Sequence, residues 1–171
     1  NPIEELGTYD LPEAQLDRFF MKISIGYPNV EQETEMLDRF LHKKDWKKTQ
    51  SVVTAEEVLG MQKEVKQVRI SKDLISYVLK IVTDTRENEN LLLGASPRAG
   101  MAVLRAAQAS AYCDARDYVL PDDVVKVLKP VLCHRLILSA EAKLNQITQV
   151  QVVSDICSRN VLPIAERMRW E

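Results

Sequence analysis

The sequence is poor in the residues that make tight turns, disulfide frameworks and membrane spans. Its 5 glycines and 7 prolines among 171 residues are too few for a turn-rich sandwich or barrel. The three cysteines, Cys113, Cys133 and Cys157, stand far apart without a C-x-x-C pair. This pattern argues against disulfides and a metal site, and predicts reduced, buried thiols. No apolar run approaches the roughly 18 residues of a membrane helix, and no secretory signal opens the chain. A cytoplasmic location is therefore predicted.

The sequence also lacks a dominant charge. Lys and Arg number 23 against 25 Asp and Glu, so the net charge is −2 and no basic field favours nucleic acid or anionic membranes. The one basic run, KKDWKK at residues 43–48, could contact phosphates and stack a base on Trp46. A solvated loop anchored by the tryptophan fits the overall charge better. No nucleic-acid partner is predicted.

Helical patterning dominates from residue 29 onward. Capping residues followed by apolar positions three and four apart predict helices that begin after the residues Asn29, Thr54, Ser71, Ser96, Leu120 and Thr148. The first of these helices should bury a stripe of four side chains: Met36, Leu37, Phe40 and Leu41. The chain is predicted to be mainly α, a helical bundle.

The clearest helix start is Ser96-Pro97, a serine at the N-cap followed by proline at the first helical position. The helix that follows carries small residues on one face, which allow neighbouring helices to approach closely. We expect it to lie at the centre of the bundle. Pro130 is expected to kink or end the helix that begins at Pro121.

Residues 1–28 differ from the rest. They start with Asn1-Pro2, no methionine precedes Met21, and Phe20, Ile23 and Ile25 alternate as in a single strand. A lone strand requires a sheet to pair with. We therefore expect two domains: residues 1–28 as a remnant of a larger α/β core with about one strand, and residues 29–171 as the helical domain.

Most catalytic templates are missing. His42 and His134 lie on different predicted helices, with no H-E-x-x-H motif and no nucleophile nearby in sequence. There is no phosphate-binding G-x-x-x-x-G-K-[ST] loop, and no Asp-Glu pair ends an apolar strand. The sequence by itself therefore predicts a chain that cannot hydrolyse a nucleotide alone.

Two arginines are candidates for anion chemistry. Arg98 lies in the first turn after Ser96, where free backbone N–H groups and the helix dipole favour an anion. Its planar guanidinium suits a phosphate, and Arg105 could extend the patch. The alternative is an exposed first-turn arginine. Arg18 follows a short helical segment and could reach a neighbouring molecule, although a surface ion pair with Asp17 is the simpler interpretation.

Four blocks together resemble one family. They are NPIE with GTY at residues 1–9, LPEAQLDRF at 11–19, GASPRA at 94–99, and RDYVLPDDV with HRLIL between 116 and 138. In this order they resemble the end of the core and the helical lid of MoxR-type AAA+ ATPases. Asp10 and Leu120 depart from the family pattern, where proline and threonine are usual. The resemblance is weaker after Ile147.

The resemblance implies roles for three residues. Asn1 aligns with sensor 1, which helps to position the water that attacks the γ-phosphate. Arg18 aligns with the arginine finger, which acts in trans on the nucleotide of a neighbouring subunit. Arg98 aligns with sensor 2, which contacts the γ-phosphate in its own subunit. No metal ligand is implied within this chain.

The resemblance also implies a function. It predicts the C-terminal part of an ATPase of about twice this length, which would use ATP and Mg²⁺ in a homo-oligomeric, hexameric ring. The ring would remodel or assemble partner proteins, often ones with von Willebrand factor A domains. The alternative is a helical protein-interaction module without nucleotide chemistry.

Overall fold

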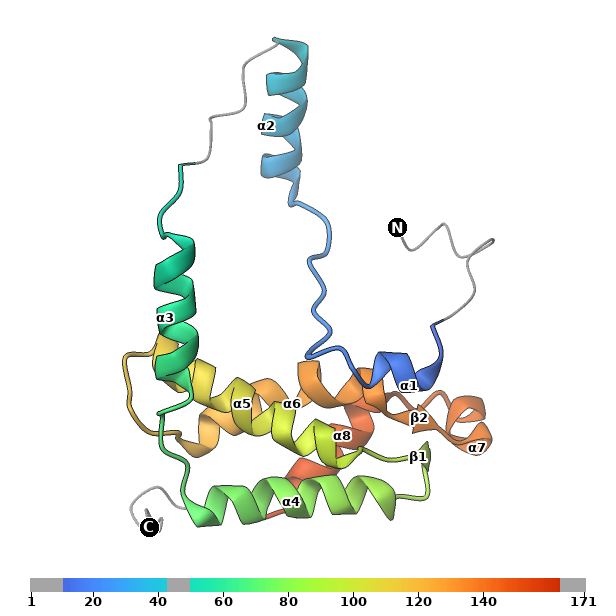
Figure 1. Cartoon of the computed structure of the whole chain (residues 1–171). Helices are drawn as coiled ribbons and strands as arrows, with labels where there is room; N and C mark the ends of the chain where they lie inside the picture. The colour runs from blue at the N-terminus through green and yellow to red at the C-terminus, as the bar shows by residue number, and fades with distance from the viewer. Residues whose placement is uncertain (1–10, 43–49, 164–171) are drawn as a thin grey trace. The chain divides into compact units, whose positions relative to one another are not determined.

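A computed structural model describes residues 11–42 and 50–163 of the chain (Figure 1). The chain divides into two compact units: Ile23–Gln62 form the smaller, and the residues before and after that segment form the larger. The predicted division into domains 1–28 and 29–171 stays a prediction. Within the described residues, no helix is both long and apolar enough to cross a membrane.

Four helices build the core of the larger unit (Figure 1). They are α4 (Lys72–Arg86), α5 (Pro97–Cys113), α6 (Pro121–Leu132) and α8 (Gln149–Arg159). Helix α5 packs against α4 and α6, and α8 packs against the same two helices. Their apolar side chains form one buried cluster that includes Leu74, Ile81, Val103, Leu128, Leu132 and Ile156. The mainly helical fold predicted from the sequence is confirmed.

The central helix α5 owes its position to small side chains. Ala99, Ala106 and Ala111 are at most 3% exposed, so the backbones of neighbouring helices can approach closely. The last residue of the helix, Cys113, is exposed, so the prediction of three buried thiols is wrong for this one. The other two cysteines are half-buried, and burial raises the pKa of each thiol.

Local capping starts several helices where the sequence predicted. The hydroxyl of Ser71 accepts a hydrogen bond from the Leu74 N–H at 3.2 Å. Thr148 and Gln151 form a reciprocal capping box at the start of α8. The short helix α7 (Ala140–Leu144) begins with Ser139, whose hydroxyl accepts from the Ala142 N–H at 3.2 Å. These starts depend on side chains only three residues away.

Proline does not end α6. The helix continues two residues beyond Pro130 to Leu132, and one turn of 3-10 helix, η1 (Cys133–Arg135), follows it. Of the two outcomes expected of Pro130, an end of the helix there is therefore wrong, and a kink stays a prediction. The carbonyl of Pro130 accepts a hydrogen bond from the Lys22 N–H at 2.9 Å, which attaches the N-terminal segment to this helix.

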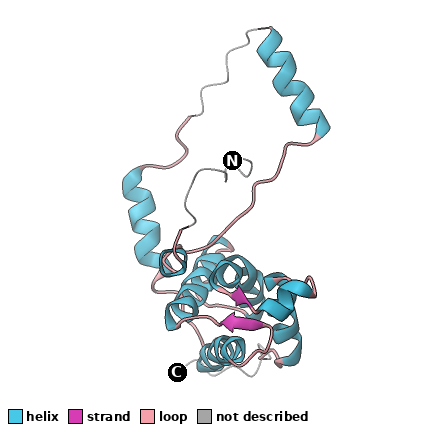
Figure 2. Cartoon of the chain, turned by 90° about the vertical axis from the view of Figure 1, so that its right-hand side faces the viewer, coloured by secondary structure: helices cyan, strands magenta, loops and turns pink. Residues whose placement is uncertain are grey.

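The strand predicted over residues 20–25 is absent. The only strands in the described part of the chain are β1 (Leu91–Leu93) and β2 (Ile137–Leu138), which pair antiparallel (Figure 2). Ile23 and Ile25 lie in loop structure and are exposed. The physical reason is that a strand needs a ladder partner, and none of the described residues provides one beside this segment.

The smaller unit contains α2 (Val30–Leu41) and most of α3 (Ala55–Val65). Asn29 and Gln32 form the predicted capping box of α2, and Thr54 and Glu57 bond reciprocally at the start of α3. The predicted burial is wrong for α2, because Phe40 is 79% exposed. The other members of its apolar stripe are also exposed: Met36, Leu37 and Leu41. The basic run at 43–48 lies outside the described residues.

Candidate functional site

Of the three residues implied to act on nucleotide, the structure describes two. Asn1 lies outside the described residues. Arg18 follows the short helix α1 (Glu13–Leu16) and is exposed. Among the described residues it makes no side-chain hydrogen bond or ion pair. The simpler interpretation, an ion pair with Asp17, is not what forms, because the Asp17 carboxylate has other partners.

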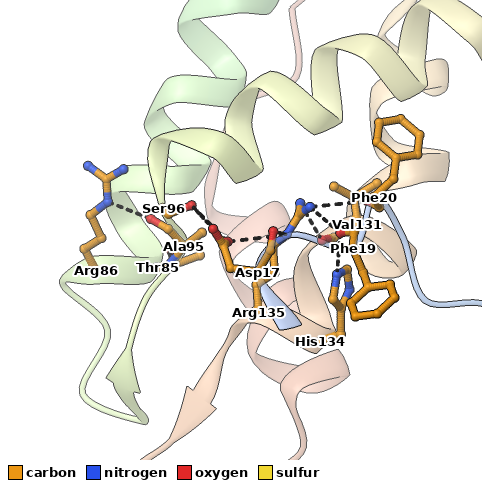
Figure 3. Close-up of polar contacts among 10 residues, drawn as sticks. All are labelled: Asp17, Phe19, Phe20, Thr85, Arg86, Ala95, Ser96, Val131, His134 and Arg135. Atoms are coloured by element: carbon orange, nitrogen blue, oxygen red, sulfur yellow. Dashed lines mark hydrogen bonds and ion pairs between the residues drawn. The ribbon is translucent and has the colours of Figure 1, made fainter. Parts of the chain in front are cut away.

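The Asp17 carboxylate is hydrogen-bonded to Ser96, the N-cap residue of α5. The hydroxyl of Ser96 donates to both carboxylate oxygens of Asp17, at 2.9 and 3.1 Å (Figure 3). Ser96 stands at the N-cap of α5 but its side chain makes no capping hydrogen bond to that helix. The position of the helix start is as predicted, whereas the predicted capping role of the serine is wrong. The hydroxyl is directed toward the carboxylate, and its oxygen accepts no N–H from the first turn of α5.

Arg135 binds the segment around Asp17 through a second set of hydrogen bonds. Its side chain is only 1% exposed, and its Nε lies 3.5 Å from an Asp17 carboxylate oxygen. The guanidinium donates to the carbonyl oxygens of Asp17 at 3.2 Å and Phe19 at 2.6 Å (Figure 3). A further hydrogen bond anchors it to the preceding helix α6, at the Val131 carbonyl, at 3.1 Å. A buried cation is thereby surrounded by acceptors.

The charge environment of Arg135 connects it to Arg98. Burial lowers the pKa of the Arg135 guanidinium, the Asp17 carboxylate raises it, and the positive charge of Arg98 lowers it further. An arginine stays protonated despite such shifts. The Arg98 side chain is exposed at the start of α5 and makes no hydrogen bond or ion pair among the described residues. Arg105, by contrast, donates to Gln108 on its own helix, at 2.8 Å.

The loop before α5 is fixed to the end of α4. The Thr85 hydroxyl accepts from the Ala95 N–H at 2.9 Å, and Arg86 Nε donates to the Ala95 carbonyl at 2.8 Å (Figure 3). Gly94 lies so close that a Cβ there would be 2.6 Å from the Thr85 carbonyl oxygen. The glycine of the GASPRA block therefore has a packing function. It permits the close contact between this loop and the end of α4, just before α5 begins and Arg98 follows in its first turn.

The two histidines have different partners. His42 lies in the smaller unit, where its Nδ1 is 2.9 Å from an Asp38 carboxylate oxygen. His134 lies in the larger unit, with Nε2 3.1 Å from the carbonyl oxygen of Phe19. No group of three or more His, Cys, Asp or Glu side chains that could hold a metal ion occurs in the part of the chain that the structure describes.

Sequence reasoning missed the residues that connect the two arginines. Asp17, Ser96 and Arg135 all stand in the blocks that carried the family resemblance, and that presence was the available signal. Their joint action was not visible, because 79 residues separate Asp17 from Ser96 and 118 separate it from Arg135. The two exposed arginines are adjacent in sequence to this part-buried polar network, since Arg18 directly follows Asp17 and Arg98 comes two residues after Ser96. Exposed guanidinium groups of this kind suit phosphate binding.

Comparisons with known proteins agree with this architecture. Residues 83–156 match the model of the AAA lid domain. The chain is 38% identical to "Uncharacterized protein YeaC" of Bacillus subtilis, over 96% of this chain and 51% of that protein. It is 36% identical to "Chaperone MoxR1" of Mycobacterium tuberculosis, over 95% of this chain and 45% of that one.

A solved structure is also similar. The crystal structure of a "putative ATPase" from Cytophaga hutchinsonii matches with a TM-score of 0.87 and 37% identity, over 96% of this chain and 52% of that one. The chain spans about half the length of the curated relatives it matches.

Proposed function

We propose that this chain, which is similar to MoxR-type AAA+ ATPases and whose residues 83–156 match an AAA lid domain, is the lid and trailing core segment of an ATP-driven, chaperone-like remodeller. The observation that supports this most directly is that two exposed arginines adjoin one part-buried network. Arg98 begins the central lid helix, and Arg18 directly follows the Asp17 carboxylate that binds the Ser96 hydroxyl two residues before Arg98.

The family resemblance implies each proposed role, and the exposed positions of Arg98 and Arg18 support it. Arg98, at the positive end of α5, contacts the γ-phosphate bound in its own subunit. Arg18, exposed and without an intramolecular partner among the described residues, reaches the nucleotide of a neighbouring subunit. There it neutralises charge on the transferred phosphoryl group, an effect of roughly 10³–10⁵ in rate in other nucleotidases. Asn1 helps to position the attacking water.

Nucleotide and metal are held chiefly by the rest of the longer protein. The described residues of this chain fit the phosphate, because they provide exposed guanidinium groups at a helix N-terminus. They do not fit Mg²⁺, because they contain no cluster of metal ligands. The sequence also has no phosphate-binding G-x-x-x-x-G-K-[ST] loop. We therefore expect the chain alone to be inactive as an ATPase.

The proposed oligomeric assembly follows from the proposed action of Arg18 on the nucleotide of a neighbouring subunit. A finger that acts on a neighbour's nucleotide requires a homo-oligomer, proposed here as a hexameric ring. Its partners are proposed to be proteins with von Willebrand factor A domains, as the family resemblance implies. The three cysteines, which are free, fit the reducing cytoplasm in which such a ring would work.

The experiment is a measurement of ATP hydrolysis and ATP affinity on the longer protein that contains this chain, with Arg98→Ala as the variant. We expect the wild type to hydrolyse ATP and Arg98→Ala to bind it more weakly or to lose turnover. Arg105→Ala is the matched control, because it removes an exposed arginine from the same helix. A wild type that neither binds nor hydrolyses ATP would favour the alternative function, a helical protein-interaction module. Unchanged binding and turnover in Arg98→Ala would overturn the sensor role.

A further inference from the structure

We infer that the hydrogen-bonded network of Ser96, Asp17 and Arg135 is a mechanical link that carries the nucleotide state sensed at Arg98 to Arg18. The inference rests on the proposed function and deepens it. In this arrangement Ser96 and Arg135 are positioning residues: they bond Asp17 and Phe19, the residues on either side of Arg18 (Figure 3).

The first step concerns the hydroxyl of Ser96. A serine at an N-cap ordinarily accepts a hydrogen bond from an N–H of its own helix. Ser96 instead donates to the Asp17 carboxylate, at 2.9 and 3.1 Å, and makes no capping bond. The start of α5 therefore has no side-chain cap, and the Ser96 hydroxyl bonds the segment that carries Arg18. A movement of the start of α5 is therefore transmitted to Asp17 through this hydrogen bond.

The second step concerns the backbone on both sides of Arg18. Arg135 donates to the carbonyl oxygens of Asp17 and Phe19, the residues immediately before and after Arg18. His134 Nε2 lies within hydrogen-bond distance, 3.1 Å, of the same Phe19 carbonyl. Further along, the Lys22 N–H donates to the carbonyl of Pro130. The Arg18 backbone is thus held to the lid while its side chain stays exposed.

The third step concerns rigidity. The Arg135 side chain is only 1% exposed, and its planar guanidinium bonds both the Asp17–Phe19 segment and the Val131 carbonyl of α6. A planar fork of donors fixes direction as well as distance, which a lysine cannot do. α5 in turn packs against α6. Arg98 and Arg18 therefore belong to one connected body, so a lid movement set by one subunit's nucleotide moves the finger that enters the next subunit.

The test uses the longer protein and the variant Ser96→Ala, which removes the bond to Asp17 without removing a helix cap. We expect kcat for ATP hydrolysis to fall about tenfold, within the range typical of coupled sites, while the Kd for ATP is unchanged. Ser96→Thr keeps a hydroxyl and should restore kcat. Ser139→Ala is the matched control: it removes a lid serine that does cap its helix and should leave kcat unchanged.

A second readout reports the link itself. Hydrogen exchange of the peptide around residues 17–22 is measured with and without a non-hydrolysable ATP analogue. We expect the analogue to change exchange there in the wild type, Ser96→Thr and Ser139→Ala, and not in Ser96→Ala. Arg135→Lys should behave as Ser96→Ala does, with thermal unfolding used to show that it is folded.

The outcomes separate the two proposals. A wild-type protein without ATPase activity overturns the proposed function and this link with it. An active wild type whose kcat and nucleotide-dependent exchange survive Ser96→Ala overturns the link alone. Equal losses of kcat in Ser96→Ala and Ser139→Ala would also overturn it, because they would reflect general destabilisation of the lid.

Discussion

Arg116 and Asp123 form a two-pronged ion pair that fixes the start of α6. Arg116 Nη1 and Nη2 donate to the two carboxylate oxygens of Asp123 at 2.7 and 2.8 Å. Asp123 also accepts from the Leu120 N–H at 2.8 Å. The carboxylate is buried and compensates for Leu120, which has no side-chain oxygen to cap the helix. The pair gives the RDYVLPDDV block a structural role.

Asp123→Asn should lower the free energy of unfolding at pH 7 by about 3 kcal/mol, because it removes the charge of the buried carboxylate and leaves Arg116 paired only with the exposed carboxylate of Asp114. Burial raises the pKa of Asp123, but the bonds from Arg116 and Leu120 outweigh it and hold the pKa below its ordinary value. A lowered pKa stabilises the fold above the unfolded-state value of about 3.9 and loses that effect as the pH falls through the folded-state value. The difference from wild type should therefore shrink below about pH 4.

Urea unfolding at pH 7 and pH 3 measures this difference. Asp117→Asn is the control, because its ion pair with Arg69 is exposed on both sides and should contribute less than about 1 kcal/mol. Equal effects of the two substitutions at pH 7 would contradict the assignment.

Gly94→Ala should destabilise the lid by about 2 kcal/mol. The added Cβ would be 2.6 Å from the Thr85 carbonyl oxygen and the Arg86 Cα, both of which are backbone atoms, so the loop or the end of α4 must shift. Thermal unfolding compares it with Gly100→Ala in α5, where the added Cβ would meet a Val82 methyl at an ordinary contact distance of 3.6 Å. That control should be neutral or stabilising by up to about 1 kcal/mol. Equal stability of the two variants would show that the loop yields freely.

Arg18→Ala in the longer protein should lower ATP turnover by roughly 10³-fold or more while nucleotide affinity stays nearly unchanged, because the arginine acts on a neighbour's site. Steady-state hydrolysis and equilibrium nucleotide binding measure the two quantities. Mixing this variant with a second one that lacks the magnesium-binding acid should restore part of the activity. Mixed rings that form without any recovery would contradict the action in trans.

Phe40→Ala should change the stability of this 171-residue chain by no more than about 0.5 kcal/mol, because the ring is 79% exposed. Leu128→Ala, which removes a core side chain only 1% exposed, should cost about 2–5 kcal/mol. Denaturant unfolding of both variants is the measurement. A loss above 1 kcal/mol in Phe40→Ala would show that α2 packs its apolar stripe after all.

The sequence by itself determined the helical class, most helix starts and the residues that resemble a known family. Helix starts could be predicted because the groups that make them lie three residues apart, as in Asn29 with Gln32 and Thr148 with Gln151. The buried face of α5 could be predicted because its small residues recur at helical spacing. The strand expected over residues 20–25 could not be settled in this way, since alternation describes a strand but does not supply its partner.

Only the tertiary structure decided how the arginines are arranged. Ser96 has the local pattern of an N-cap, yet Asp17, 79 residues earlier in the chain, takes its hydroxyl. Arg135 is a buried anchor only because the carbonyls of Asp17 and Phe19 come to lie beside it. Capping and periodicity are local properties that neighbouring residues encode. The partners of a hydroxyl or a guanidinium depend on which distant groups the packed helices bring within hydrogen-bond distance, and that is decided by the fold.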